Sequence, residues 1–310
     1  MASIDFDNEL ILVTAASGKQ AANLIPHLVK KWKHLRLAVR SSSSKESLSS
    51  KYPDAEVVQA DLSDQKACRD LLKGVTACFL ITPAFTSHES ICGINMIDAA
   101  RENIKSGGPF KHFVHSSVLH PIIRPMANHD SKRQIEEYLV TSSLQYTILQ
   151  PTHMMEMLPL AKLAKEDKPT HTMPWNPSTK FCFVSAVDVG EAAARVFEGR
   201  EKHFYATYEI VGTAVPQDYH DVLKIVSEAI GKEVRIEKKP LEEMAAAIAG
   251  VTVKDADEDV RREVKQGFAR MFLHYDEHGL LGNPNVLKML LGREPLDWNA
   301  YVKRTLESLS

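Results

Sequence analysis

One short segment near the N-terminus carries small residues where the chain turns from a strand into a helix. It reads TAASGKQA over residues 14–21 and follows the apolar run LILVTA (10–15). Small residues at such a turn allow a tight bend, close approach of a pyrophosphate to backbone N–H groups, and close helix–strand packing. Gly18 takes the middle role, while Ala15 and Ala21 stand where glycine is more usual. The free amides of the following helix would face the phosphates, so the segment predicts dinucleotide binding. An ordinary strand–loop–helix is the alternative.

The end of the second predicted strand indicates which dinucleotide is bound. NAD enzymes carry an acidic residue there, which holds the ribose 2′-hydroxyl. This chain instead has Arg40, followed by four serines that begin at Ser41, and then Lys45. A guanidinium flanked by hydroxyl donors suits a 2′-phosphate. We therefore expect NADP(H) as the cofactor, with a solvated basic loop as the alternative.

The first half of the chain has the pattern of the sheet that must position these turns. Short continuous apolar runs alternate with amphipathic stretches, which is typical of a parallel sheet covered by helices on both faces. We predict an α/β fold of the Rossmann type with a doubly wound parallel sheet. Strands are expected over residues 10–15, 36–40, 56–61, 77–82, 112–118 and 146–151, and helices over 18–32, 64–74, 87–105 and 130–141.

The rhythm changes after Pro151, where Met, Pro and His are frequent, as in loops and short helices around a cleft. A strand returning to the sheet is expected over 181–184, then a helix with Ser185 or Asp188 near its start. The serine-rich stretch 41–50 is expected to be a polar loop. We predict an NADP-binding domain over residues 1–155, with 181–212 returning to its sheet. A smaller, discontinuous and mainly helical substrate domain would cover 156–180 and 213–310.

The turn TAASGKQA resembles the TGATGKQG turn of the NmrA-like family, an atypical branch of the short-chain dehydrogenase/reductases. Further similar segments are VRSSSSK, VVQADLSD, HFVHSSV, HDSKRQIEEYL, TILQPTHMMEML, FVSAVDVGEAA and LLGREPLDWNAYV, which together cover most of the chain. In the last part of its PTxFMEN-like segment this chain has Met157 where the family often has Asn. The resemblance implies that the cofactor is held by Thr14, Ala16, Ser17, Gly18, Lys19, Gln20, Arg40, Ser41, Asp61, Leu62, Thr82, Pro83, Ala84, Lys132, Thr152, His153, Met154, Met155 and Glu156, of which the last five would lie along the nicotinamide.

Physical reasoning supports several of these positions independently. Asp61 ends the third predicted strand, where a carboxylate can accept a hydrogen bond from the adenine amino group. The segment 82–84 follows the fourth strand on the carboxyl edge, where open α/β sheets bind ligands. Lys132 opens a helix after the fifth strand and could bond ribose hydroxyls and place a positive charge beside the nicotinamide. A solvated surface lysine is the alternative.

The proton donor of this site differs from that of the short-chain dehydrogenases. Short-chain dehydrogenases use Tyr-x-x-x-Lys, but Asn128 stands four residues before Lys132. Histidine titrates near neutral pH and can donate a proton. His153 is our candidate because it replaces an aromatic residue expected to face the nicotinamide, and Ser117 resembles the serine of the short-chain dehydrogenases. The predicted catalytic residues are therefore Lys132, His153 and Ser117, with packing or turn roles as alternatives.

The composition of the chain indicates which classes of binding partner to expect. The 310 residues carry a formal net charge of −2, without the basic excess usual in nucleic-acid binders. The four cysteines and the histidines lack metal-ligand spacing, so we expect no metal. The N-terminal residues do not resemble a targeting peptide, and no apolar run is long enough to span a membrane. We expect a cytoplasmic protein with a small-molecule substrate and neither nucleic acid nor membrane as partner.

These observations favour an NADP(H)-dependent reductase of a small, largely apolar organic substrate (carbonyl, imine, quinone or enone), plausibly in secondary-metabolite chemistry. Met154, Met155, Met157, Met173 and Trp175 would give an apolar lining to the substrate pocket, with core packing as the alternative for each methionine. Two other functions stay open. One is a regulator that senses NADP and binds a protein partner without turnover. The other is a cofactor-bound cyclase or isomerase that transfers no hydride.

Overall fold

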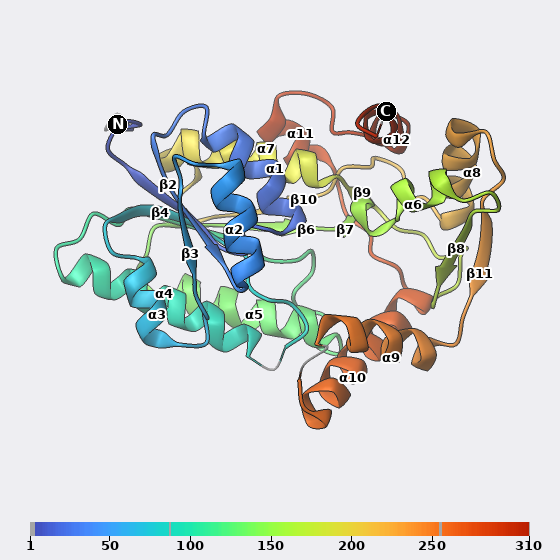
Figure 1. Cartoon of the computed structure of the whole chain (residues 1–310), viewed down its shortest axis with the longest axis horizontal. Helices are drawn as coiled ribbons and strands as arrows, with labels where there is room; N and C mark the ends of the chain where they lie inside the picture. Colours follow the sequence, from blue (N-terminus) through green and yellow to red (C-terminus); the bar gives the residue numbers. More distant parts are fainter. Residues whose placement is uncertain (1–3, 87, 254–255, 310) are drawn as a thin grey trace.

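The structure is a computed structural model that describes residues 4–86, 88–253 and 256–309. A sheet of seven parallel strands forms its centre, in the order β10–β6–β5–β4–β1–β2–β3 (Figure 1). From β1 the chain adds strands as far as β3 and then places β4 on the other side of β1. This reversal makes the sheet doubly wound and confirms the predicted fold class. The strands are β1 (Leu10–Val13), β2 (His34–Val39), β3 (Glu56–Gln59), β4 (Val75–Leu80), β5 (His112–Ser116), β6 (Tyr146–Pro151) and β10 (Ala206–Ile210).

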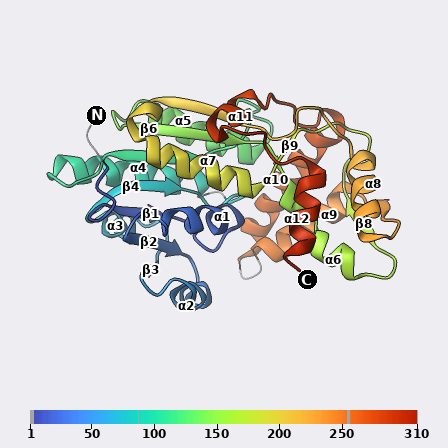
Figure 2. The same ribbon diagram turned by 90° about the horizontal axis from the view of Figure 1, so that it is seen from above.

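Successive side chains of a strand enter two separate cores, one on each face of the sheet. Ile11 and Val13 pack into the first core, whereas Leu12 between them packs into the second. Both faces of β1 are therefore apolar, which explains the continuous apolar run. The first core is covered by α1 (Lys19–Leu28), α2 (Ser42–Lys51), α7 (Ala186–Gly199) and α11 (Asn285–Leu291), and the second by α3 (Gln65–Leu71), α4 (Glu89–Lys105) and α5 (Ala127–Val140) (Figures 1 and 2).

Helices α1 and α7 touch at their backbones. A Cβ atom on Gly190 of α7 would lie 2.6 Å from the carbonyl carbon and oxygen of Asn23 in α1. That separation is far inside contact distance, so the position requires glycine. Ala21, at the third small-residue place of the turn, is fully buried. The close packing behind the turn therefore depends on a glycine far away in the sequence.

The serine-rich stretch forms helix α2, so the prediction of a polar loop over residues 41–50 is wrong. The Ser41 hydroxyl accepts a hydrogen bond from the backbone N–H of Ser44 at 3.2 Å, which is the usual N-cap arrangement. Leu48 is buried beneath the helix. The parallel strands β2 and β3 also need a crossover over one face of the sheet, and α2 forms part of it.

A third core lies beside the sheet and is rich in aromatic rings, among them Phe181, Phe183, Tyr219, Tyr275 and Trp298 (right side of Figure 1). The elements of this region and the remaining short elements are β7 (His153–Met154), η1 (Met155–Met157), α6 (Leu160–Lys165), β8 (Thr170–Met173), β9 (Phe183–Val184), η2 (Arg200–His203), α8 (Tyr219–Ile230), β11 (Arg235–Lys238), α9 (Leu241–Thr252), α10 (Glu258–Glu277) and α12 (Trp298–Glu307).

The strand expected over 181–184 does not join the central sheet. It is the short β9, which pairs with β7 in a separate two-stranded sheet, and β10 takes the edge position beside β6. The helix that follows begins after Ser185, whose hydroxyl accepts from the N–H of Val187, as expected for its cap. The division into two domains stays a prediction. None of the helices in the described ranges is long and apolar enough to span a membrane.

Candidate functional site

The carboxyl ends of β1 and β4 are joined by one side chain. The Thr14 hydroxyl donates to the carbonyl oxygen of Ile81 at 2.8 Å and accepts from the N–H of the same residue at 2.8 Å. These strands lie where the winding of the sheet reverses, and ligands of open α/β sheets bind in the crevice at this point. Thr14 therefore fixes the floor of the crevice.

The turn after β1 adopts the backbone conformation of a dinucleotide-binding turn, although Ala15 and Ala21 replace the usual glycines. Ala15 has a φ of 45°, in the left-handed region that favours glycine. Gly18 is the N-cap of α1, and no side chain caps this helix. A Cβ atom on Gly18 would lie 3.1 Å from the carbonyl oxygen of Ala15, so the turn is tight here. The N-terminal amides of α1 are left without a side-chain acceptor, as an anion-binding turn requires.

A cavity of about 320 Å³ opens over this turn. It brings together eight of the predicted cofactor residues, and these come from the carboxyl ends of four neighbouring strands. They are Thr14, Ser17, Gly18, Arg40, Asp61, Leu62, Pro83 and Ala84. Thr252, from the last turn of α9, lines the same cavity. Ala16 and Ser17 also line a neighbouring cavity of about 310 Å³ against α2.

The two charged groups in the cavity differ in how they are held. The Asp61 carboxylate accepts from the N–H and the hydroxyl of Ser63 at 2.9 and 2.8 Å. These hydrogen bonds lower the pKa of Asp61, and the nearby charges of His88 and Arg40 add to the effect. Arg40 is exposed, and no carboxylate in the described ranges forms an ion pair with it. Its guanidinium is therefore available to an anion, whereas the neighbouring Ser41 is used as the cap of α2.

Lys132 lies in a buried polar cluster rather than in solvent. Its Nζ is 2.9 Å from Oε1 of Glu89 and 2.5 Å from Oγ1 of Thr82, and it also donates to the carbonyl oxygen of Ser116 at 3.4 Å. Thr82 donates in turn to Oε1 of Glu89 at 2.9 Å. Helix α5 begins at Ala127, three residues before the predicted start, so Lys132 lies inside the helix. The cluster joins α4, α5 and the end of β4.

Ser116, whose carbonyl accepts from Lys132, also connects this cluster to the turn after β1. The Ser116 hydroxyl donates to Oε1 of Gln20 at 2.6 Å. Gln20 lies in the first turn of α1, and Ser116 ends β5. Two predicted cofactor residues, Gln20 and Thr82, therefore use their side chains to connect protein elements.

Ser117 lies near the Glu136 carboxyl of α5. Its hydroxyl is buried and has no partner of ordinary hydrogen-bond geometry among the described groups. It is nevertheless close enough to the Glu136 carboxyl to affect the pKa of that group. Gln150, near the end of β6, donates from its amide nitrogen to both oxygens of Glu136, at 2.9 and 3.0 Å. Burial raises the pKa of Glu136 against these contacts and the charge of Lys132.

His153 lies in the aromatic core and not among the polar residues of α5. Its Nε2 is 2.9 Å from the Tyr219 hydroxyl, and the rings of Trp175, Phe181 and Tyr275 surround it. Burial lowers its pKa to about 4, and the neighbouring His171 adds to this. The ring is therefore neutral at pH 7, and its Nε2 is already paired with a protein group. This placement does not favour the prediction that His153 donates a proton.

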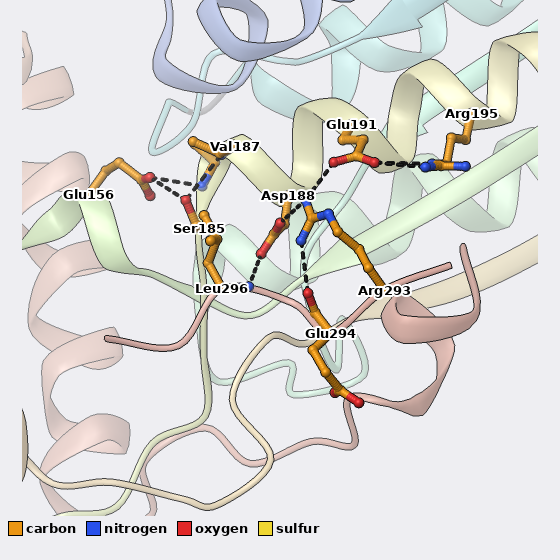
Figure 3. Close-up of polar contacts among 10 residues, drawn as sticks. Glu156, Ser185, Val187, Asp188, Glu191, Arg195, Arg293, Glu294 and Leu296 are labelled. Atoms are coloured by element: carbon orange, nitrogen blue, oxygen red, sulfur yellow. Dashed lines mark hydrogen bonds and ion pairs between the residues drawn. The ribbon is translucent and has the colours of Figure 1, made fainter. Parts of the chain in front are cut away.

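The segment predicted to lie along the nicotinamide makes mainly protein contacts. Oε1 of Glu156 accepts from the Ser185 hydroxyl and the N–H of Ala186 at 3.0 and 2.9 Å, so it helps to cap α7 (Figure 3). The backbone carbonyl of Glu156 accepts from Nζ of Lys19 at 2.6 Å. Thr152 donates to the carbonyl oxygen of Cys182 at 3.1 Å. Burial raises the pKa of Glu156, whose Oε2 has no partner in the described part of the chain.

The methionines expected to line a substrate pocket have different surroundings. Met155, Met173 and Trp175 are all buried in the third core. Met157 is 61% exposed, and Met154 packs against the first core. Core packing, the alternative interpretation, therefore describes Met155 and Met173.

Three residues at this site were missed from the sequence. Glu89 opens α4, where an acidic residue is ordinarily explained by the helix dipole alone. Glu136 follows Lys132 by four residues, a spacing that places both on one helix face and could have been noticed. Thr252 reaches the cavity from a distant helix, which no local pattern indicates. Across the described ranges, no three His, Cys, Asp or Glu side chains are arranged to hold a metal ion, and the expectation of no metal stays a prediction.

Comparison with known proteins gives one family and a set of similar folds. The family model described as the NmrA-like family matches residues 7–305. No curated protein sequence matches the chain. An NADPH-dependent quinone oxidoreductase from Escherichia coli, solved with NADPH, has a TM-score of 0.72 and 20% identity, with 96% of this chain and 99% of that chain covered.

Two further solved structures are similar over nearly their whole length. The triphenylmethane reductase from Citrobacter sp., in complex with NADP(H), has a TM-score of 0.75 and 19% identity, with 95% of this chain and 99% of that chain covered. NmrA, a negative transcriptional regulator in complex with NADP, has a TM-score of 0.71 and 18% identity, with 97% and 96% covered. At these identities the likeness shows the fold.

Proposed function

Because the chain belongs to the NmrA-like family, we propose that it is an NADP(H)-dependent reductase of a small, largely apolar organic acceptor. The acceptor would be a carbonyl compound, an imine, a quinone or an enone, plausibly in secondary-metabolite chemistry. The observation that carries the proposal is the cavity at the carboxyl edge of the sheet, in which the turn at Gly18, Arg40 and Asp61 face one space.

The groups around this cavity fit the parts of NADP(H). The uncapped N-terminus of α1 suits the pyrophosphate, and the close approach of Gly18 to the Ala15 carbonyl oxygen disfavours a side chain there. The guanidinium of Arg40, which forms no ion pair within the described ranges, suits the 2′-phosphate. Asp61, held as a carboxylate by Ser63, can accept from the adenine amino group. Each group would thus meet a part of the cofactor with the complementary charge or hydrogen bond.

Lys132 would bind the ribose of the nicotinamide half. An ammonium has three N–H donors, and here they are directed at Glu89, Thr82 and the Ser116 carbonyl. The bond to Ser116 is the longest of the three, at 3.4 Å, so a ribose hydroxyl would replace it at the smallest cost. When bound, the reduced cofactor supplies a hydride to the acceptor. The chain must then orient the acceptor and provide the proton.

The apolar side of the site is formed by the loop after β4 and by the mainly helical region. Phe85, which follows Pro83 and Ala84, stacks on Phe268 of α10 with ring centroids 4.0 Å apart. Thr252 of α9 lines the cavity itself. We expect an aromatic or conjugated acceptor to bind on this side.

A regulator that senses NADP is the second candidate. It is favoured by Asn128, which stands where the short-chain dehydrogenases have their tyrosine, and by the placement of His153 away from Lys132. Such a protein would bind the cofactor tightly and transfer no hydride to any acceptor. A non-redox cyclase or isomerase makes the same prediction for hydride transfer but converts its substrate.

The experiment that tests the proposal has two stages. NADPH is first titrated into the protein by calorimetry, and its oxidation is then followed with a panel of quinones, enones, imines and ketones. Binding followed by turnover of one acceptor class supports the reductase. Binding with no NADPH oxidation by any acceptor would favour the regulator or the cyclase, and absence of binding would contradict all three.

A further inference from the structure

The reduction of a carbonyl or quinone needs a proton as well as a hydride. The tyrosine of the short-chain dehydrogenases is absent here, and the predicted donor His153 is paired elsewhere. Asn128 cannot act as an acid. Nε2 of His153 is already paired with the Tyr219 hydroxyl, and the ring is neutral at pH 7. The proton source has to be found among the other polar groups at the carboxyl edge.

Ser117 and Glu136 are two proton-bearing groups at this edge, and the Ser117 hydroxyl affects the pKa of the Glu136 carboxyl. Ser117 follows the end of β5, and its side chain is buried with its hydroxyl lacking a partner of ordinary geometry in the described structure. Leaving a buried hydroxyl unpaired is unfavourable, so its partner is expected to arrive with a ligand. Glu136 is on the same face of α5 as Lys132, one turn further along, and approaches the Ser117 hydroxyl.

The Glu136 carboxyl is fixed in this position by the sheet. Gln150 donates to both of its oxygens, so the carboxyl cannot swing out to solvent without losing these bonds. Its exposed neighbour on α5, Glu137, is instead paired with Arg133. The contrast shows that Glu136 is held towards the sheet while the next residue faces water.

We propose that Glu136 acts through Ser117 as the proton store of the reductase. The inference rests on the proposed function. As the acceptor carbon gains the hydride from the reduced cofactor, which is thereby oxidised, the acceptor oxygen takes the proton of the Ser117 hydroxyl. The serine oxygen takes the proton of the Glu136 carboxylic acid in the same movement, so no free alkoxide forms. Water returns a proton to the Glu136 carboxylate between turnovers.

The electrostatic surroundings are consistent with this assignment. Burial raises the pKa of Glu136, while Ser117, Gln150 and the charge of Lys132 lower it. Ser117 and Gln150, which face it from the sheet, are neutral, and the charge of Lys132 is itself balanced by Glu89 of α4. The acid form of Glu136 therefore persists to a higher pH than that of an ordinary glutamate. A proton store must be protonated, so proton-dependent turnover falls as the pH rises through this pKa.

Two classes of acceptor separate proton supply from hydride transfer. A quinone or ketone needs both, whereas a triphenylmethane dye cation is neutralised by hydride alone. We expect Glu136→Gln to slow quinone or ketone reduction about tenfold or more, and by a clearly larger factor than it slows dye reduction. Ser117→Ala gives the same split, and Ser117→Thr, which keeps a hydroxyl, restores much of the rate. Glu137→Gln, with the same charge change on the exposed side of α5, is the matched control.

Two further readouts do not depend on this comparison of rates. The high-pH decline of quinone reduction is expected in the wild type and absent in Glu136→Gln, while dye reduction shows no such decline. In protein without cofactor, the infrared band of a protonated carboxylic acid is expected to persist at pH values above those at which an ordinary glutamate ionises. This band should be lost in Glu136→Gln. If Glu136→Gln slows quinone and dye equally, or the pH profile is unchanged, the proton store is contradicted. If the wild type reduces neither acceptor class, the proposed function itself fails.

Discussion

Nζ of Lys132 lies 2.9 Å from Oε1 of Glu89, and the two side chains are only 9% and 0% exposed. The pair joins α5 to α4 directly above the end of β4, where Thr82 contacts both charged groups. Protein groups alone thus hold Lys132 in one position. A lysine that is solvated on a helix surface would have to be ordered on binding.

Removing one partner of this pair should destabilise the protein strongly. Glu89→Gln leaves the Lys132 charge buried without a counter-ion, and Lys132→Met does the same to Glu89. We expect each to lower the free energy of unfolding by about 3–5 kcal/mol, and the double variant to lose much less than the sum. Urea unfolding of the four proteins measures this cycle. Additive losses would show that the two charges do not interact.

Arg40 should select NADPH over NADH. A charge-assisted contact with the 2′-phosphate contributes about 1.5–3 kcal/mol, which corresponds to roughly tenfold or more in affinity. Calorimetry should give that preference in the wild type and lose it in Arg40→Ala, with NADH affinity unchanged. Lys45→Ala is the control. It removes the same charge from an exposed position on α2 that does not line the cavity over the turn at Gly18, and it should keep the preference for NADPH. Equal affinities for both cofactors in the wild type would refute the assignment.

Ala15→Gly should stabilise the protein. Ala15 has a φ of 45°, where an L-residue is strained by roughly 1–2 kcal/mol and glycine is not. Glycine also adds freedom to the unfolded chain, so a net gain of up to about 1 kcal/mol is expected. Ala16→Gly is the control, because Ala16 is buried and has no positive φ, and it should destabilise. A loss of stability with Ala15→Gly would show that the turn carries no such strain.

Stability should fall on mild acidification. Burial lowers the pKa of His129, His153 and His171 to about 4, below the usual 6.5. The unfolded chain therefore binds more protons between pH 6.5 and 4, so the free energy of unfolding decreases as the pH falls through this range. Each group contributes about 1.4 kcal/mol per pH unit. His171→Phe keeps a ring stacked on Tyr219 and should make the slope shallower in urea unfolding at several pH values. An identical slope would mean that His171 does not titrate in this way.

The sheet could be predicted from the sequence because its strands are apolar on both faces. The run Leu10–Val13 fills two cores, and the turn at Gly18 and the position of Arg40 follow from it. The serine-rich helix α2 could not be recognised by hydrophobic periodicity, because Leu48 is its one buried residue. Its cap at Ser41 was the available signal.

The polar half of the site depends on contacts between distant segments. Glu89 and Lys132 are 43 residues apart, and the role of each becomes visible only when α4 and α5 lie side by side. His153 was chosen from its place in a motif, but the aromatic rings around it come from segments far along the chain. The spacing of motifs along the sequence indicated the edge of the sheet at which the site lies. Which side chains there are left without a protein partner depends on tertiary packing.

The central claim is that this chain transfers a hydride from NADPH to an organic acceptor. It is tested most directly with NADPH deuterated at C4, a panel of quinones, enones, imines, ketones and triphenylmethane dyes, and mass spectrometry of the products. The account predicts deuterium in the product of at least one acceptor class, with a lower yield in Lys132→Ala. Tight binding of NADPH with no deuterium in any product would contradict it.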